Sequence, residues 1–356
     1  MTITEIRQEL HRTPGKSGQE EFAHNLIVRE LQTICPDELY DHVGDYGVIA
    51  LWRSHNENAR TLAFRADIDA LPSGHRCGHD GHTAIMLRFA QIVSSDHNRK
   101  NNIVLIFQPE EETGKGAKKI MKRGILQKIG IDAIFGLHNL PGYDKGTVVL
   151  IKNTFAAASS GVIYRFIGRQ THASTPEKGL NPGLAVAEMI QRVNESNKIS
   201  SNKFCFSTLI CCRVGEEAFG TSAGKGEVMF TLRASDNHSF FELTQKVDRI
   251  SIEVAEKHGL QLEKQVREPF RALENSPELV EQLSDILRYA QVQMRSTSFR
   301  WSEDFAEYLT EFRGAFFGIG SGKDQPELHH PDYDFPDDII EIGAGCFEFI
   351  MNNIKI

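Results

Sequence analysis

Four short apolar runs in the first 140 residues constrain the fold more than any other feature of this sequence. They span residues 48–52, 61–65, 103–107 and 132–138, and between them residues 83–93 show a helical apolar period and residues 116–123 form a shorter basic segment. Strand-like runs that alternate with helices are typical of a largely parallel sheet covered by helices. In such sheets, ligand sites lie beyond the carboxyl ends of the strands. We therefore expect an α/β fold with a mostly parallel, mixed sheet.

The pattern changes at about residue 158. From there to about residue 265, the expected elements follow the order β-α-β-β-α-β, which is that of a ferredoxin-like α+β unit. A chain of 356 residues also exceeds what one hydrophobic core usually supports. We expect one domain made of residues 1–157 and 266–356, with a second domain, residues 158–265, inserted into it.

Composition excludes several classes of protein. The formal charge of −8, without clustered Lys and Arg, argues against a nucleic-acid partner. No stretch approaches the roughly 20 apolar residues of a membrane-spanning helix, and the first residues lack the basic and apolar regions of a signal peptide. The six cysteines show no disulfide-framework spacing. These features predict a soluble cytoplasmic protein with no membrane partner.

Polar side chains follow the apolar runs at the sheet edge where ligands are expected. The nine-residue stretch HRCGHDGHT (75–83) adds a cysteine and histidines to the same edge. The candidates are Asp67, Cys77, His79, Glu111, Glu112, His138 and one of His329 and His330. Because one metal ion takes four or five ligands, this set suits two adjacent divalent ions. The pair Glu111-Glu112 can supply one ligand and one general base, and the residues alone leave open which does which.

Eight segments resemble, in order, motifs of the M20 metallopeptidase family. The resemblance is greatest to its amidohydrolase branch, which contains aminoacylases, hippurate hydrolases, auxin-conjugate hydrolases and N-acetyldiaminopimelate deacetylases. The segments are LHRTPGKSGQE (10–20), RADIDALP (65–72), HRCGHDGHTA (75–84), QPEEETGKGAKK (108–119), GLHNLP (136–141), THAS-P (171–176), SEDF (302–305) and LHHPDYDF (328–335). The resemblance implies that residues 1–157 and 266–356 form a catalytic two-metal domain. It also implies that residues 158–265 are a lid and dimerisation domain.

The resemblance assigns roles to individual residues. It implies the metal ligands Cys77, His79, Glu112, His138 and His329, the last because the family has histidine two positions before proline. Glu111 matches the general base, and Asp67 matches a carboxylate that orients a ligand. In the inserted domain, His172 matches a residue that hydrogen-bonds the oxyanion. Arg233 there matches a residue that grips the substrate carboxylate, a task suited to a guanidinium.

The implied activity is metal-dependent hydrolysis of the amide bond of N-acyl amino acids. Two divalent ions (zinc, manganese, cobalt or nickel) would bridge a water molecule, with Glu111 as its general base. In several family members the counterpart of His172 comes from the partner subunit, so a homodimer through the lid is expected. The alternatives are a dipeptidase or carboxypeptidase on the same fold, which would take short peptides, and a catalytically inactive metal-binding relative.

Two departures from the family pattern concern substrate recognition. Only Ser73 and Gly74 separate the second and third motifs, where relatives have a much longer segment, and Gly220 stands where many relatives have asparagine. Three further histidines are expected to have no role in the chemistry. His82 is expected to be a helix-start residue, and His11 and His42 are expected to be structural or solvated.

Overall fold

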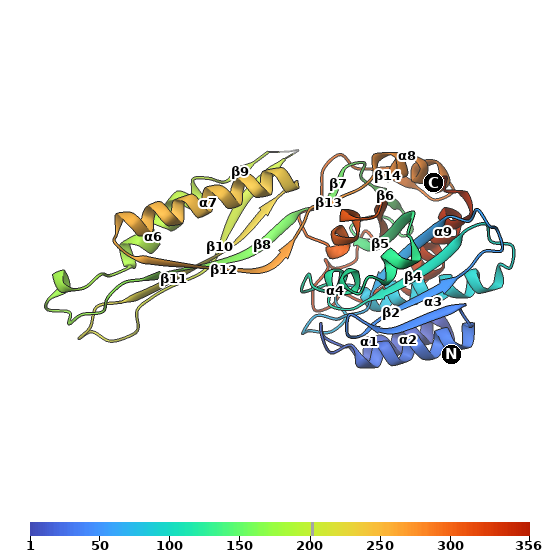
Figure 1. Ribbon diagram of the computed structural model, residues 1–356, viewed down its shortest axis with the longest axis horizontal. Coiled ribbons are helices and arrows are strands. Elements are labelled where there is room, and N and C mark those ends of the chain that lie inside the picture. Colours follow the sequence, from blue (N-terminus) through green and yellow to red (C-terminus); the bar gives the residue numbers. More distant parts are fainter. Residues whose placement is uncertain (201–202) are drawn as a thin grey trace. The chain divides into compact units, whose positions relative to one another are not determined.

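The computed structural model describes residues 1–200 and 203–356, which divide into two compact units (Figure 1). The larger unit comprises Met1–Phe155, Glu274–Ser296 and Glu303–Ile356, and the smaller comprises Ala156–Leu273 and Thr297–Ser302. The smaller unit thus extends beyond the expected 158–265 boundaries. Its last long strand continues to Phe270, and the 297–302 segment belongs to it because the Ala157 amide donates to the Trp301 carbonyl at 2.9 Å.

The larger unit is built on an eight-stranded mixed sheet in the order β1-β2-β4-β3-β5-β15-β6-β14. Its centre, β4-β3-β5-β15, is parallel, whereas β2 and β6 pair antiparallel with the two sides of that centre. The strands are β1 (Glu38–Val43), β2 (Gly47–Trp52), β3 (Thr61–Asp67), β4 (Asn102–Gln108), β5 (Ala133–Pro141), β6 (Val148–Leu150), β14 (Val292–Met294) and β15 (Gly314–Gly322). The predicted mostly parallel α/β fold is confirmed.

One layer of helices shares a hydrophobic core with alternate residues of this sheet. Phe64 of β3, for example, packs against Phe89 and Phe347 with ring centroids 4.8 and 5.1 Å apart. Burying each such side chain contributes roughly 1.5–3 kcal/mol, which fixes the helices to the sheet. The layer consists of α1 (Ile3–Arg12), α2 (Glu21–Ile34), α3 (His79–Ser95), α8 (Pro277–Ile286) and α9 (Ile340–Asn353). The remaining helical segments of this unit are α4 (Gly116–Lys122), α5 (Ile125–Ile129), η2 (Asp304–Thr310) and η3 (Asp337–Ile339).

The smaller unit is an antiparallel sheet in the order β12-β8-β11-β10-β9, with α6 and α7 together on one face (Figure 1). Its long elements follow the order β8-α6-β10-β11-α7-β12, which confirms the predicted ferredoxin-like connectivity. The elements are β8 (Ala158–Ile167), η1 (Pro176–Lys178), α6 (Gly183–Asn194), β9 (Lys198–Ile199), β10 (Phe204–Val214), β11 (Lys225–Ala234), α7 (Asn237–Lys257) and β12 (Gln261–Phe270). Two short strands, β7 (Thr154–Ala156) and β13 (Leu273–Glu274), form a separate two-stranded sheet.

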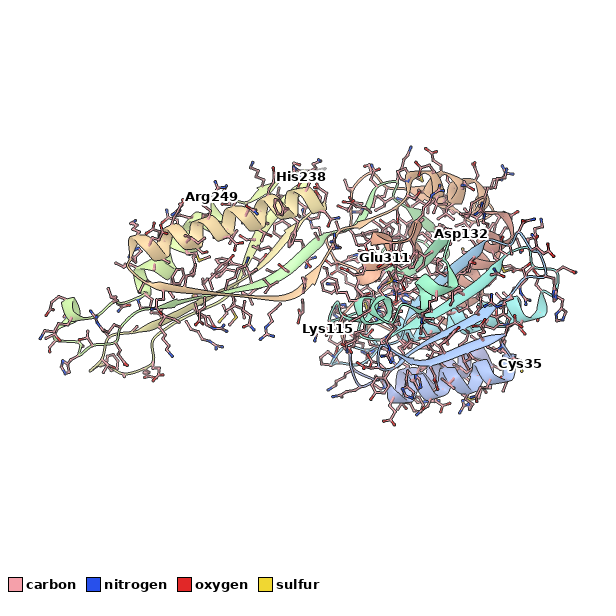
Figure 2. The ribbon with its side chains drawn as sticks, in the orientation of Figure 1. Cys35, Lys115, Asp132, His238, Arg249 and Glu311 are labelled. Atoms are coloured by element: carbon pink, nitrogen blue, oxygen red, sulfur yellow. The ribbon has the colours of Figure 1, made fainter. Side chains whose placement is uncertain are left out.

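Two further features concern the surface and the thiols. Across the described residues, no helix combines the length and the apolar character that crossing a membrane requires. All six cysteines are free thiols. Cys35 is exposed where α2 ends (Figure 2), whereas Cys77 is buried.

Candidate metal centre and active site

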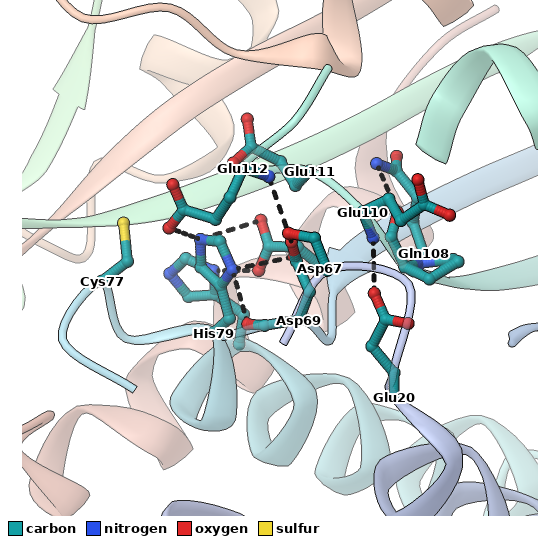
Figure 3. Close-up of polar contacts among 12 residues, drawn as sticks. Glu20, Asp67, Asp69, Cys77, His79, Gln108, Glu110, Glu111 and Glu112 are labelled. Atoms are coloured by element: carbon teal, nitrogen blue, oxygen red, sulfur yellow. Dashed lines mark hydrogen bonds and ion pairs between the residues drawn. The ribbon is translucent and has the colours of Figure 1, made fainter. Parts of the chain in front are cut away.

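The central strands deliver the predicted site residues to one rim of the sheet. β3 ends at Asp67, β4 is followed by the acidic segment that contains Glu111 and Glu112, and His138 lies near the end of β5. Because β4, β3 and β5 are parallel neighbours, their carboxyl ends meet at the same edge. Figure 3 shows the resulting group of acids around His79.

A single glycine places Cys77 and His79 at this rim. Gly78 between them has a φ of 97°, and α3 begins immediately afterwards at His79. A Cβ atom on Gly78 would lie 2.4 Å from Oδ1 of Asn139, so no larger residue fits without a shift. The apolar period predicted this helix only from Thr83. The helix begins earlier because its first turn consists of buried polar residues that contact the site.

Two groups of potential ligand atoms share Cys77. In one group, ligand atoms of Cys77, His79 and His138 lie within 4.8 Å of one another, and in the other Cys77 groups in the same way with Glu112 and His329. The structure therefore brings together all five residues that were predicted as metal ligands. His329 has a φ of 69° and its amide donates to the Arg76 carbonyl at 2.8 Å, which holds the His329 loop beside the cysteine.

Backbone carbonyls orient the rings of the two buried histidines, and Nε2 of His138 lies 3.6 Å from Sγ of Cys77. Nδ1 of His79 lies 3.0 Å from the Asp69 carbonyl oxygen, and Nδ1 of His138 lies 2.8 Å from the carbonyl oxygen of Asn139. A ring nitrogen that faces a carbonyl carries the proton, so Nε2 of each ring presents its lone pair. Asp69 also places a carboxylate oxygen 3.3 Å from Nδ1 of His79.

Two buried atoms at the centre of this group have no hydrogen-bond partner among the described residues. They are Nε2 of His79 and Oε1 of Glu112, which lie 3.9 Å apart. Buried polar atoms are rarely left unpaired, and a divalent ion would satisfy both. Sulfur, imidazole and carboxylate donors together suit a borderline ion such as zinc. The residues present thus fit a metal centre.

Asp67, predicted to orient a ligand, is fully buried and contacts two histidines. Its Oδ1 lies 2.6 Å from Nδ1 of His82, and its Oδ2 lies 3.8 Å from Nε2 of His79. Nε2 of His82 faces Oδ1 of Asn139 at 2.6 Å. His82 lies in the first turn of α3, as expected of a helix-start residue, and its ring also bridges Asp67 and Asn139. The carboxylate at Nδ1 of His79 is Asp69, and the signal for it was the second acid of the Asp-Ile-Asp sequence.

Behind these residues, Arg65 is fully buried among carboxylates. It lies 2.7 Å from Asp67, 3.0 Å from Glu303 and 2.9 Å from Asp304, and it donates to Gln108 at 2.8 Å. Sequence reasoning included Glu303 and Asp304 only as part of a family motif. In the structure they place two further acids beside the site, and one guanidinium faces three carboxylates.

Glu111 is buried, and its Oε1 accepts a hydrogen bond from the Asp304 amide at 3.4 Å. Burial raises the pKa of Glu111 well above its ordinary value, and the charges of Glu303 and Glu112 act in the same direction. Burial also raises the pKa of Glu112 to about 7. A carboxyl whose pKa lies above its usual range can hold a proton near neutral pH, as a general acid-base group must.

His172 and Arg233 lie in the smaller unit. The Ser174 amide donates to Nδ1 of His172 at 3.1 Å, so the proton of this exposed ring sits on Nε2. Arg233 donates to Oγ of Ser302 at 3.1 Å and to the Arg300 carbonyl. Burial lowers the pKa of Arg233, and within the described part of the chain it forms no ion pair with a carboxylate.

Residues 63–353 match peptidase family M20/M25/M40, so the chain belongs to this family of metal-dependent hydrolases, which cleave carbon–nitrogen bonds. An uncharacterised hydrolase of Staphylococcus aureus is 27% identical over 382 residues, which cover 99% of this chain and 98% of that protein. The solved structure of a dinuclear metal-binding M20 peptidase from Bacillus subtilis has a TM-score of 0.84 at 23% identity, covering 98% of this chain and 96% of that one. An aminobenzoyl-glutamate utilization protein from Klebsiella pneumoniae has a TM-score of 0.77 at 20% identity, covering 99% and 96%. These two structures share the fold of this chain.

Proposed function

We propose that this chain is a two-metal amidohydrolase that releases a free amino acid from an N-acyl amino acid. The observation that carries the proposal is the pair of ligand groups joined by Cys77, with buried Glu111 in neither of these two groups. Cys77, His79, Glu112, His138 and His329 would hold the ions. Zinc suits these donors, and manganese, cobalt and nickel are the other candidates.

We assign the role of general base to Glu111, because it is buried beside Glu112 and belongs to neither of the two ligand groups. Two divalent ions held beside it would supply a shared water of lowered pKa and polarise the amide carbonyl. Glu111 takes a proton from the attacking water and returns it to the leaving amine, so the same carboxyl is base and then acid. Burial favours the protonated form between these two transfers, and the Asp304 amide keeps the carboxylate in place.

The smaller unit would supply the substrate-binding groups. Because Nε2 of His172 carries the proton, it can donate to the oxyanion of the tetrahedral intermediate. Such a donor is worth roughly 3–4 kcal/mol in other enzymes. Arg233 has no carboxylate partner among the described residues, and its guanidinium would bind the free carboxylate of the amino acid in a bidentate manner.

This carboxylate-binding role favours a substrate that ends in a free carboxylate, as an N-acyl amino acid does. The Klebsiella protein of the same fold is named for aminobenzoyl-glutamate, which is an acylated amino acid. A dipeptidase or carboxypeptidase is the alternative, because a peptide also ends in a free carboxylate. The nature of the group on the amino side of the scissile bond separates the two activities.

We also propose a homodimer formed through the smaller unit. β10 pairs with β9 only at Phe204 and Cys205, and the rest of β10 is the edge of the sheet among the described residues. That edge carries Leu209 and Ile210, which are 43% and 59% exposed. An apolar edge strand is a template for pairing with another chain. The cytoplasmic location stays a prediction.

A substrate panel tests the proposed activity. Purified protein loaded with zinc, manganese, cobalt or nickel is incubated with N-acetyl and N-benzoyl amino acids, their α-carboxamides and unblocked dipeptides, and released amino acids are quantified. The proposal predicts turnover of the acyl amino acids, and weaker turnover of the carboxamides. The Arg233→Ala variant should lose most activity toward the acids and little toward the carboxamides. Cleavage of dipeptides alone would favour the peptidase, and no turnover with two bound ions would favour an inactive relative.

A further inference from the structure

Three side chains at the edge of the large sheet form a cluster that the proposed reaction does not use. One ring nitrogen each of His24 and His42 and a carboxylate oxygen of Asp41 lie within 4.8 Å of one another. Asp41 and His42 belong to edge strand β1, which is separated from β3 by β2 and β4. We infer that His24, Asp41 and His42 form a separate, peripheral binding site for a divalent transition-metal ion.

Backbone carbonyls orient both histidine rings of this cluster. Nδ1 of His24 lies 2.9 Å from the carbonyl oxygen of Tyr46, and Nδ1 of His42 lies 3.1 Å from that of Asp45. Each Nδ1 therefore carries the proton, and each Nε2 keeps its lone pair. The centroids of the two rings lie 4.2 Å apart, and the angle between the ring planes is 30°. A carbonyl at one nitrogen that fixes the other for a metal is the usual support of a histidine ligand.

The backbone of β1 departs from a regular strand at the two consecutive ligands. In a regular strand, neighbouring side chains point to opposite faces, so Asp41 and His42 could not converge. The β1–β2 register shifts between Tyr40 and Val43, and His42 has a φ of 49°, in the left-handed region that a non-glycine residue rarely adopts. Such irregularities re-aim side chains. Here the irregularity brings Asp41 and His42 to the same place as His24 of α2.

The charges of the cluster also suit a cation. Asp41 forms no ion pair within the described ranges of the chain. Another group of potential ligands, His11, Asp80 and Asp334, differs in this respect. Its two carboxylates lie 3.4 and 2.7 Å from Arg7, which already supplies the positive charge.

The donor set indicates the class of ion. Two imidazole nitrogens and one carboxylate oxygen suit zinc, copper or nickel and are a poor set for magnesium or calcium. Asp41 and His42 are exposed, so water can complete the coordination shell. The site needs none of the residues of the candidate active site, so it stands or falls independently of the proposed hydrolase activity.

Zinc stoichiometry tests the site. Wild-type protein and the variants His42→Asn and Asp41→Asn are dialysed against the same buffered Zn²⁺ concentration, and bound zinc is measured by elemental analysis. His55→Asn, which replaces another exposed histidine, is the control. Asparagine tolerates a positive φ, so His42→Asn preserves the backbone. We expect wild type and the control to bind one more zinc ion per chain than the two cluster variants. Equal zinc content in all four proteins would overturn the inference.

Two further measurements distinguish a defined site from loose surface binding. The difference in Cu²⁺ paramagnetic resonance between wild type and His42→Asn should show coupling to two imidazole nitrogens, and coupling to one or none would contradict the assignment. Added zinc should raise the thermal midpoint of wild type more than that of His42→Asn, because only the wild type binds the extra ion. Hydrolase activity should be the same in both proteins.

Discussion

Replacement of Arg65 by methionine should destabilise the larger unit more than any surface change of the same kind. Arg65 is the cation that faces Asp67, Glu303 and Asp304 within 3.0 Å, and all four side chains are buried. Methionine has a similar length but no charge, so the variant keeps most of the volume and leaves the carboxylates uncompensated. Breaking a buried ion pair in this way costs about 3–5 kcal/mol.

The loss should depend on pH with a defined sign. Burial already raises the pKa of Asp304 to about 7 although Arg65 acts to lower it, so removing the guanidinium raises this pKa further. A carboxyl whose pKa is higher in the folded than in the unfolded protein destabilises the fold at high pH. The penalty disappears as the pH falls toward the unfolded value near 4. The destabilisation should therefore be larger at pH 8 than at pH 5.

The assay is denaturant unfolding followed by tryptophan fluorescence. The chain has two tryptophans, so a Trp301→Phe background leaves Trp52 of β2 as a probe of the larger unit. Arg60→Met is the matched control, because Arg60 pairs with Asp132 at 3.1 Å but is 59% exposed. It should cost no more than about 1 kcal/mol. If the free energy of unfolding of Arg65→Met at pH 8 lies within 1 kcal/mol of that of its background, the guanidinium does not compensate the buried carboxylates in the way described.

Two other changes probe the site from different sides. Cys77→Ala should lower the bound metal by at least one ion per chain and abolish turnover, because Cys77 belongs to both ligand groups; unchanged metal content would exclude it as a ligand. Burial lowers the pKa of His75 to about 4, so in metal-free protein His75 should reduce the free energy of unfolding by on the order of 3 kcal/mol as the pH falls from about 6.5 to 4. The His75→Phe variant should lose that part of the pH dependence, and an unchanged pH profile would show that His75 does not cause it.

The centre of the fold could be predicted from the sequence, and its edges could not. β2 and β3 are buried at every position and therefore appear as continuous apolar runs. β1 is mostly polar and half-exposed, and β6 and β14 have three residues each. These strands exist because a neighbour pairs with them, and no period in their sequence shows it. The irregularity that turns His42 toward His24 arises in the pairing of β1 with β2. No period in the sequence indicates it, and His42 was therefore expected to be structural or solvated.

The candidate site was predictable in its residue types, but its geometry depends on distant segments. Spacing alone could not separate Glu111 from Glu112. In the structure, Glu112 lies 3.9 Å from both His79 and His329, whereas Glu111 faces the Asp304 amide. That amide lies 193 positions further along the chain, so only the folded structure brings it to Glu111.

The most direct test of the proposed chemistry is the Glu111→Gln variant, assayed for metal and turnover in the same preparation. Glutamine keeps the size of the side chain and its hydrogen bond with the Asp304 amide, but it cannot take up the proton from water. The metal content should equal that of the wild type, and hydrolysis of N-acyl amino acids should fall by at least about a hundredfold. Wild-type turnover in a variant with full metal content would contradict the role of Glu111 as the general base.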